Sequence, residues 1–448
     1  MNRGDHTGTR DGRVAASASS HIGLWRRLTG GLRDYRSSVK LFSRNVRLYL
    51  LGSFLIGVNF SVFNLLFNLY LKEIGFVEGQ IGIVNSSRAI GMTLVAIPAA
   101  MILSRIRLKP LLMVACVLFA LFSFGQTTIQ QWSLLLGSAV LTGMSFAFFR
   151  IASGPFYMRN STRTERTHLF SFSFGMHLLA GMLGSWGAGH LVTVIGERTG
   201  DIVLGYQYTL YLAIAIGFLA LIPFALVKAA APSSEENRIH LNPAQLKRRG
   251  MFYFKVTFVN FLIGTGAGLI IPFMNLYFRD RFQLPPDRIG FFFILLSFGM
   301  LVGTLCGPLL TGKAGLVRTI VATQLASIPF MLTLAYSHLL WLAVPAFVIR
   351  GGLMNMGVPI STNFAMELCE KQEQGLVNAL LSVSWTSSWM VSVAIGGSLI
   401  EHYGYTLVLS VSSALYLISA LSYFWFFGRI EKRSSDGSGW YVPRDVQL

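Results

Sequence analysis

The stretch FLIGVNFSVFNLLFNLY, from Phe54 to Tyr70, returns 207 positions later as FLIGTGAGLIIPFMNLY, from Phe261 to Tyr277. The two copies share seven of their 17 residues. After one inserted residue the correspondence continues at an offset of 208. Its matched pairs are Ile81 with Ile289, Gly82 with Gly290, Gly91 with Gly299, Gly143 with Gly351, Phe156 with Phe364, Met158 with Met366, Glu165 with Glu373, Gly189 with Gly397 and Leu191 with Leu399. A register that holds over this length predicts a duplicated unit.

Each copy of the unit holds six apolar runs, and a run of roughly 20 such residues is long enough to cross a membrane as a helix. The predicted spans are 48–71, 81–103, 110–127, 132–156, 168–193, 206–227, 252–277, 288–311, 317–336, 339–363, 375–400 and 404–427. The sequence therefore predicts an all-α integral membrane protein with 12 transmembrane helices in two six-helix bundles. Because each copy has an even number of spans, the two bundles have the same orientation in the membrane.

The composition and the charge distribution support this reading. Of 448 residues, 53% are apolar and 12% are charged, against about 25% charged in soluble proteins. A soluble globular enzyme is therefore excluded. The net charge of +18 does not indicate nucleic-acid binding, because 29 of the 37 Lys and Arg residues fall in segments on one side of the predicted membrane. Loops rich in Lys and Arg stay on the cytoplasmic side of a membrane, so we expect a plasma-membrane protein with both termini in the cytoplasm.

The spans and charges divide the chain into five segments. They are a basic amphipathic cytoplasmic tail (1–46), an amino-terminal bundle (47–228), a cytoplasmic linker (229–250), a carboxy-terminal bundle (251–428) and a cytoplasmic tail (429–448). Apolar residues recur in the first tail at helical spacing with arginines between them, which predicts a helix lying on anionic inner-leaflet lipids.

The arrangement of six plus six helices around a basic linker resembles the major facilitator superfamily over residues 45–428. The stretch AMILSRIRLK, between the second and third spans, matches the family's loop motif at Arg105 and Lys109, whereas Ser104 replaces its Asp. The stretch GAGLIIPFMNLYF is similar to bacterial drug-efflux members. The resemblance implies a secondary active transporter, an efflux antiporter that works by alternating access, with Arg105 and Lys109 at a gate.

Ionisable side chains in the interior of the predicted spans include Arg88, Arg150, His177 and Arg350. Such groups are costly in lipid and are functional candidates by default. Arg350 and His177 lie near the predicted midplane and, with Arg88, are candidates for substrate binding. The alternatives are a buried guanidinium bonded to helix carbonyls for Arg350 and a neutral, hydrogen-bonded core histidine for His177. Arg150 lies nearer the inner surface, where its side chain can extend to water, so a structural role is favoured and gating is the alternative. No Asp or Glu falls within a span, so an anionic or neutral solute is favoured, with any proton coupling through His177 or the substrate.

Polar and aromatic side chains on the predicted cavity helices supply further candidates. Asn59, Asn64 and Asn355 are candidates for substrate binding, although interhelical hydrogen bonding is an equal alternative for each. Asn68 and Asn275 occupy equivalent positions in the two copies and predict a gate or a packing contact near the outer end. Trp385 and Trp389 stand one helical turn apart, either to stack on a flat ligand or to pack against lipid or core.

Other function classes find little support in the sequence. There is no HExxH metal set and no phosphate loop, so a membrane enzyme is not expected, and neither a metal nor a cofactor is predicted. The alternative on the same fold is a flippase for a lipid or glycolipid. The expected partners are an unidentified small molecule or drug-like amphiphile and the lipid bilayer, without nucleic acid, and we expect a monomer.

Overall fold

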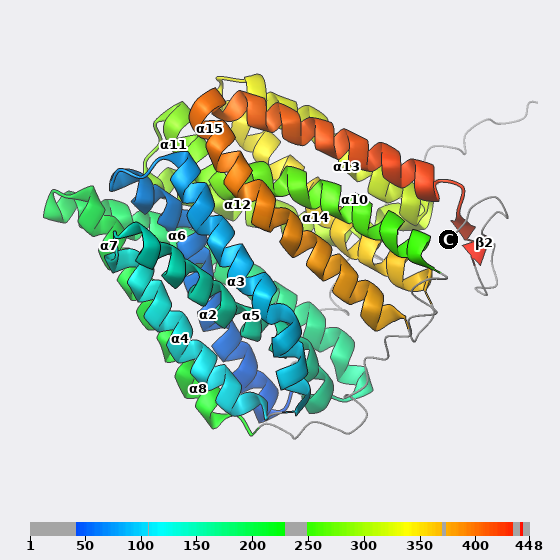
Figure 1. The fold of residues 1–448 in the computed structure, drawn as a ribbon, viewed down its shortest axis with the longest axis horizontal. Helices are drawn as coiled ribbons and strands as arrows, with labels where there is room; N and C mark the ends of the chain where they lie inside the picture. The colour runs from blue at the N-terminus through cyan, green and yellow to red at the C-terminus, as the bar shows by residue number, and fades with distance from the viewer. Residues whose placement is uncertain (1–41, 106, 229–248, 370–372, 433–439, 442–448) are drawn as a thin grey trace, which may run out of the picture.

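The computed structural model describes residues 42–105, 107–228, 249–369, 373–432 and 440–441, and helices make up almost all of it (Figure 1). The elements are α2 (Arg44–Glu73), α3 (Glu78–Arg105), α4 (Leu108–Thr128), α5 (Trp132–Asn160), α6 (Arg163–Thr199), α7 (Ile202–Leu219), α8 (Leu221–Leu226), α10 (Gly250–Ile270), η1 (Ile271–Phe273), α11 (Met274–Phe282), α12 (Pro286–Ala314), α13 (Leu316–Tyr336), α14 (Leu340–Glu367), α15 (Gln374–Phe427), β1 (Glu431–Lys432) and β2 (Trp440–Tyr441). The amphipathic helix expected in the first tail lies outside the described residues, as does most of the linker.

Ten helical stretches among the described residues are long and apolar enough to cross a membrane. One of them, α15, turns at Gly404, where φ is 75° and ψ is 176°. Glycine adopts such a conformation without the steric cost that a Cβ would bring, so α15 supplies both spans predicted on either side of this residue. With α3, which is 28 residues long, the arrangement agrees with the predicted all-α membrane fold.

Two predicted spans are interrupted at proline. The span expected over 252–277 is divided into α10, the 3₁₀ turn η1 and α11, and η1 contains Pro272. The span over 206–227 is divided into α7 and α8, with Pro223 in α8. Proline has no backbone N–H to continue the helical hydrogen bonds. The interruption in the second copy frees the Pro272 carbonyl, which has a role described below.

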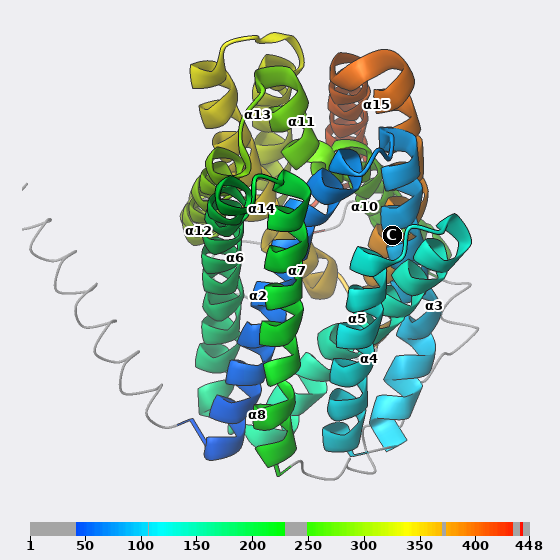
Figure 2. The ribbon, with the colours of Figure 1, turned by 90° about the vertical axis from the view of Figure 1, so that its left-hand side faces the viewer.

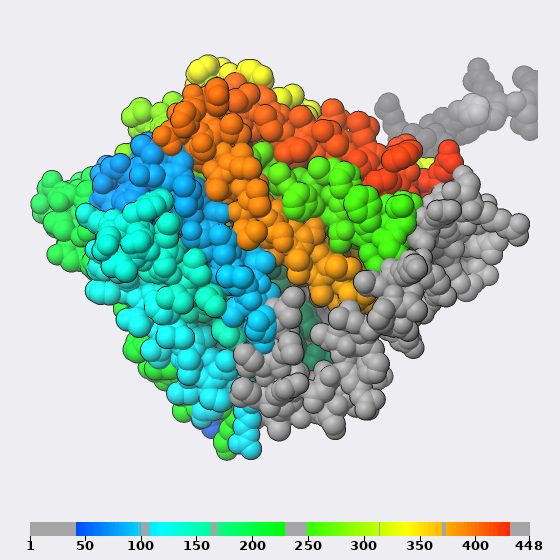
Figure 3. Space-filling model, viewed as in Figure 1, coloured from blue at the N-terminus to red at the C-terminus, as the bar shows by residue number. Residues whose placement is uncertain are grey.

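The two bundles meet at one end of the molecule and diverge towards the other (Figures 1 and 2). We call the end where α2 begins, α8 ends and α10 begins the linker end, and the end with the turn at Gly404 the far end. The halves contact each other through α3 with α15, α6 with α12 and α2 with α11. Figure 3 shows a hollow between α3 and the first part of α15, towards the linker end. The far end is closed in this structure.

Equivalent hydrogen bonds in the two halves confirm the predicted duplication. The Tyr70 hydroxyl donates to the carbonyl of Thr127 at 2.8 Å, and the Tyr277 hydroxyl donates to the carbonyl of Leu334 at 2.7 Å. The two donors are 207 residues apart in the sequence, and so are the two acceptors. Both tyrosines belong to the repeated NLY triplet, so the sequence similarity reflects an equivalent position in each bundle.

Two close approaches between glycines, which we call the glycine crossings, join the halves. A Cβ added to Gly82 of α3 would lie 3.1 Å from the Cα of Gly397 on α15. A Cβ added to Gly290 of α12 would lie 3.4 Å from the Cα of Gly189 on α6. An offset of 208 relates the two pairs. Small residues let membrane helices approach to backbone contact, so each crossing depends on the absence of side chains.

Candidate functional site

Two asparagines join the halves at the far end. Asn68 of α2 donates its side-chain N–H to the carbonyl of Pro272 at 2.6 Å, and Asn275 of α11 donates to the carbonyl of Leu65 at 2.6 Å. The donors are 207 residues apart, as are the acceptors, so the two bonds are related by the pseudo-twofold axis between the bundles. Both asparagines are buried. This reciprocal pair, the asparagine clasp, bridges the two halves on the central helices.

Charged side chains add a second contact between the halves at the far end. Arg279 pairs with Glu73 at 2.7 Å, and the backbone N–H of Gly79 donates to Glu401 at 3.1 Å. Sequence reasoning missed these contacts. Their signal lies in the repeat, because the NLY triplet is followed in one copy by LysGlu at Lys72 and in the other by ArgAsp at Arg279. Opposite charges at equivalent positions can pair across a pseudo-twofold axis.

Arg150 lies on the face of α5 that packs against α2 and α6 of its own bundle. Phe146, one turn before it on the same face, stacks on Phe60 of α2 with ring centroids 4.2 Å apart. Tyr157, two turns after it, is hydrogen-bonded to Ser173 of α6 at 2.6 Å. The face therefore meets α2 and α6, both of which contact the other half. Arg150 itself is exposed, although it lies within a predicted span.

His177 lies on α6 where three helices come together. One turn before it, Ser173 contacts α5 through Tyr157. One turn after it, Gly181 lies between Ser61 of α2 and Ser297 of α12, at 3.8 and 3.7 Å from a Cβ built on the glycine. Because α12 belongs to the other half, His177 lies beside the junction of the two bundles. Its side chain is exposed.

Arg150 and His177 together form a positively charged site between α5 and α6. The Arg150 guanidinium is near enough to act electrostatically on the His177 imidazole. Neither side chain has a hydrogen-bond partner among the described residues. A guanidinium presents two parallel N–H donors to a carboxylate or phosphate, and an imidazole either donates or accepts a hydrogen bond. The pair is suited to hold one anionic group.

Acidic side chains lie away from this pair. Across the described helices, Asp and Glu occupy positions near one end of the molecule or the other. They are Glu73, Glu78, Glu197, Asp201, Asp280, Asp287 and Glu401 towards the far end, and Glu367 and Glu373 towards the linker end. No described carboxylate is therefore placed at mid-helix depth to neutralise the site or to attract a cation.

Arg350 lies inside the carboxy-terminal bundle, where the structure corrects its predicted place in the cavity. Its side chain is 4% exposed and donates to the Tyr416 hydroxyl at 2.5 Å. Tyr416 lies on the second part of α15 and packs against Gly266 of α10. The guanidinium therefore points into its own half and is closed off from the space between the bundles. Depth along the helix was predicted from the sequence, whereas the face was not.

Arg88 likewise bonds within its own half. Its guanidinium donates to the side-chain carbonyl of Gln126 on α4 at 2.9 Å, and lies 5.3 Å from the ring centroid of Phe67. Gln126 in turn donates to Thr142 of α5, the residue equivalent to Arg350. Arg88 thus lies near the α3–α5 contact of one bundle, and Arg350 lies near the α12–α14 contact of the other. Arg88 comes from α3, whereas Arg350 comes from α14, which is the equivalent of α5.

The remaining candidates lie in several places. Asn59 is fully buried against Gly217 of α7, which is a packing position, and Asn355 donates to the carbonyl of Gly351 on its own helix at 3.0 Å. Asn64 is exposed. The rings of Trp385 and Trp389 lie 5.9 Å apart. The Trp385 ring lies beside Gly264 of α10, and the backbone of Trp389 lies beside Gly268.

The loop motif between α3 and α4 is partly described. Arg105 ends α3, and its side chain lies outside the described residues. Lys109 is half-buried in the first turn of α4. A gating role for both residues stays a prediction.

Comparison with protein families gives a match over most of the chain. The family model described as Major Facilitator Superfamily matches residues 49–255 and 256–440. An uncharacterized MFS-type transporter of Yersinia pestis (strain Pestoides F) is 23% identical over 373 residues, which cover 81% of this chain and 90% of the relative. A second, from Yersinia pseudotuberculosis serotype O:3 (strain YPIII), is 26% identical over 214 residues, covering 46% and 52%.

Solved structures share the fold at low sequence identity. A bacterial homolog of the human lysosomal transporter Spinster has a TM-score of 0.69 at 13% identity, covering 87% of this chain and 96% of that one. A D-xylose–proton symporter has a TM-score of 0.68 at 15% identity, covering 87% and 97%. The human organic anion transporter MFSD10 has a TM-score of 0.57 at 15% identity, covering 85% and 98%. The named substrates differ, so this likeness establishes the fold alone.

Proposed function

The chain belongs to the Major Facilitator Superfamily, and from this premise we propose that it is a secondary active transporter that exports a small anionic or neutral organic solute by alternating access. The observation that supports the substrate class is the exposed Arg150 near the exposed His177, on the neighbouring helices α5 and α6. The pseudo-symmetric contacts at the far end support the alternating mechanism, because equivalent helices of the two halves meet there and can separate together when the halves rock.

The far-end contacts suggest how the bundles rock. The asparagine clasp and the pair of Arg279 with Glu73 hold the far end shut. The glycine crossings lie between helices that stay in contact along much of their length, so they can act as pivots. Opening of the far end breaks the two asparagine hydrogen bonds and the ion pair while the linker end closes. A bound solute shifts this equilibrium only through different contacts in the two states.

The site favours a negatively charged group through electrostatics. Arg150 keeps its charge at all physiological pH values, whereas the imidazole of His177 is a group that can take up and release a proton. In the membrane interior, where water is scarce, a guanidinium without a protein carboxylate is stabilised by an anionic ligand. His177 is the residue proposed to couple a proton to the solute, because it is the titratable group beside Arg150.

The orientation of the protein follows from its basic segments. The linker end carries most of the Lys and Arg residues, and basic loops remain in the cytoplasm. We place the linker end in the cytoplasm of the cell, so the structure represents the state that is open inwards. A flippase for a lipid or glycolipid is the alternative on this fold, and it differs in needing a substrate with an acyl chain.

The proposal is tested with purified protein in proteoliposomes. Uptake is compared for anionic, neutral and cationic members of matched solute pairs, and for a lysophospholipid, with and without a pH gradient. We expect the anion of each pair to be transported about tenfold better than its cation, because a charge-assisted hydrogen bond contributes about 1.5 to 3 kcal/mol. Preferred transport of the cations would overturn the proposed substrate class, and transport of the lysophospholipid alone would favour the flippase.

A further inference from the structure

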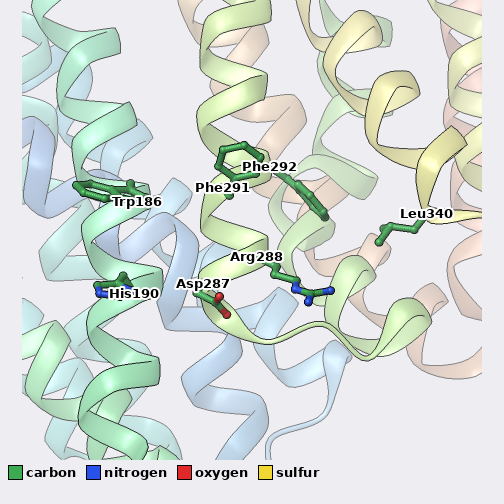
Figure 4. Close-up of a pocket in the computed structure, with 7 residues that line it drawn as sticks. All are labelled: Trp186, His190, Asp287, Arg288, Phe291, Phe292 and Leu340. Carbon is green, nitrogen blue, oxygen red and sulfur yellow. The ribbon is translucent and has the colours of Figure 1, made fainter.

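A groove of 440 Å³ lies at the far end between α6, α12 and α14, away from the Arg150–His177 site. Its volume is within the range of about 300 to 1,000 Å³ that is typical of small-molecule sites. In Figure 4, Trp186 and His190 lie on α6, and Phe291 and Asp287 lie on the neighbouring α12. Arg288 lies on the next face of α12, towards α14. The groove is thus built by both halves of the molecule.

The groove lies on the outer side of the contact between α6 and α12. That contact is made by Gly189 against Pro286 and by Gly290 against Ser185. On its inner side the neighbouring residues are buried in the core. On its outer side the next residues along each helix, Trp186 and Phe291, are 57% and 50% exposed. Large apolar side chains so exposed on membrane helices face the bilayer.

The depth of the groove matches the polar boundary of the bilayer. Asp287 is in the first turn of α12, and Leu340 is the first residue of α14. Trp186, one turn deeper than His190, is of the residue type enriched at the membrane–water interface. The charged groups of the groove therefore lie at headgroup level and its aromatic groups point towards the acyl chains.

The three ionisable groups of the groove lack partners among the described residues. One carboxylate oxygen of Asp287 is buried without a hydrogen bond. Arg288 and His190 are exposed, and neither makes a described ion pair. A buried acceptor without a donor is rare and calls for a ligand, water or ion. The groove offers one anionic acceptor beside one cationic donor and one imidazole, above an aromatic surface.

We propose that this groove binds the headgroup of a zwitterionic aminophospholipid. The lipid's primary ammonium group donates to the orphaned oxygen of Asp287, its phosphate accepts from Arg288, and an acyl chain lies along Phe291 and Trp186. Opposite charges in the groove match the opposite charges of one headgroup. The proposal does not depend on the transported solute, since the groove lies outside the site between the bundles.

The consequence of binding is conformational. The lipid would contact α6 of one half and α12 of the other while the far end is closed. A ligand that binds one state more tightly shifts the population towards it. Bound aminophospholipid therefore stabilises the state with a closed far end.

Native mass spectrometry of the delipidated full-length protein tests the assignment. Phosphatidylethanolamine, its N-methylated and N,N-dimethylated forms, and phosphatidylcholine are added at equal concentration, together with phosphatidylglycerol. Because the trimethylated group has no N–H to donate, we expect phosphatidylethanolamine to bind about tenfold better than phosphatidylcholine, the fold-change for one charge-assisted hydrogen bond. Binding should fall with each methyl group added to the ammonium group, and this comparison uses the wild-type protein alone.

Two variants test whether Asp287 and Arg288 bind the lipid headgroup. Asp287→Ala should reduce the ratio of phosphatidylethanolamine binding to phosphatidylcholine binding to about one. Arg288→Gln should weaken the binding of all the phospholipids, because a hydrogen-bond donor to the phosphate is lost. Glu197→Ala and Arg198→Gln are the matched controls, since both are exposed near the end of α6 and should leave binding unchanged. Equal binding of phosphatidylethanolamine and phosphatidylcholine by the wild type, or an unchanged preference in Asp287→Ala, would overturn the proposal. Equal competition by free phosphoethanolamine would overturn the assignment to a lipid.

Discussion

Replacement of Gly397 by leucine is expected to reduce the transport rate about 100-fold. A Cβ at this position would lie 2.4 Å from the carbonyl oxygen of Glu78 and 3.0 Å from the Cα of Gly82. Both atoms are backbone, so no flexible side chain can move aside. Overpacking of a close contact costs about 1 to 3 kcal/mol, and about 3 kcal/mol corresponds to roughly a 100-fold change in the population of the closed far end.

The measurement for this prediction is the initial uptake rate in proteoliposomes, with size-exclusion chromatography to show that each variant is folded. Gly189→Leu tests the equivalent crossing, where a Cβ would lie 2.4 Å from the carbonyl oxygen of Pro286. Gly375→Leu is the control on the same helix as Gly397, because nothing lies within 4 Å of a Cβ at that position. Near-normal transport by both crossing variants would show that close approach of the helices is not required.

Arg150→Gln is expected to weaken binding of a transported anion by about 10- to 100-fold, as loss of a charge-assisted hydrogen bond of about 1.5 to 3 kcal/mol predicts. The side chain is exposed and unpartnered among the described residues, so its loss should leave the melting temperature near the wild-type value. Affinity is measured by isothermal titration calorimetry, or by the solute concentration that gives half-maximal uptake.

Arg350→Gln is the matched variant, and it should behave in the opposite way. Arg350 is buried and donates to Tyr416, so its replacement leaves a buried polar group without its partner and lowers the melting temperature. Its effect on anion affinity should stay within about twofold, since Arg350 is buried in its own bundle and shares no partner with Arg150 or His177. If Arg350→Gln abolished anion binding in folded protein while Arg150→Gln did not, the assignment of the site would be wrong.

The duplication could be predicted from the sequence, and so could the equivalence of particular positions in the two halves. The offset of 207 residues places Asn68 and Asn275 at equivalent positions, and the structure shows them in reciprocal hydrogen bonds between the halves. The offset of 208 likewise relates Gly82 and Gly189 to their counterparts in the other half. That these glycines meet across the halves was not predicted, because a match between copies says which positions are equivalent and not which are in contact.

The direction in which each arginine points could not be read from the sequence. A helix that is apolar on all sides has no polar face to show where its interior lies. Position along the helix placed Arg350 near the midplane and Arg150 nearer one surface, yet Arg350 is buried in its own bundle while Arg150 is exposed. The face of each helix is decided by its neighbours, here Tyr416 for one arginine and Phe60 with Ser173 around the other. Only the packed structure supplies these neighbours.

The groove at the outer edge of α6 and α12 was also absent from the sequence reasoning. Asp287 lies outside the predicted spans and His190 near the end of one, so neither stood out as a buried charge. The groove forms because an α6–α12 glycine contact brings residues of the two halves side by side. A site between segments about 100 residues apart carries no local pattern that sequence inspection can find.

The central claim is that two equivalent bundles open alternately at the far end and the linker end around Arg150 and His177. Distances between paired spin labels test it most directly, in protein whose Cys116, Cys306 and Cys369 are replaced by alanine or serine. One pair is placed at Val77 and Tyr403 at the far end, and the other at Arg107 and Arg318 at the linker end, all of them exposed.

In lipid bilayers, addition of a transported anion should lengthen the far-end distance in part of the population and shorten the linker-end distance in the same proportion. Arg150→Gln should abolish this response to the anion. Distances that stay fixed at both ends during measured transport, or that lengthen at both ends together, would contradict the account.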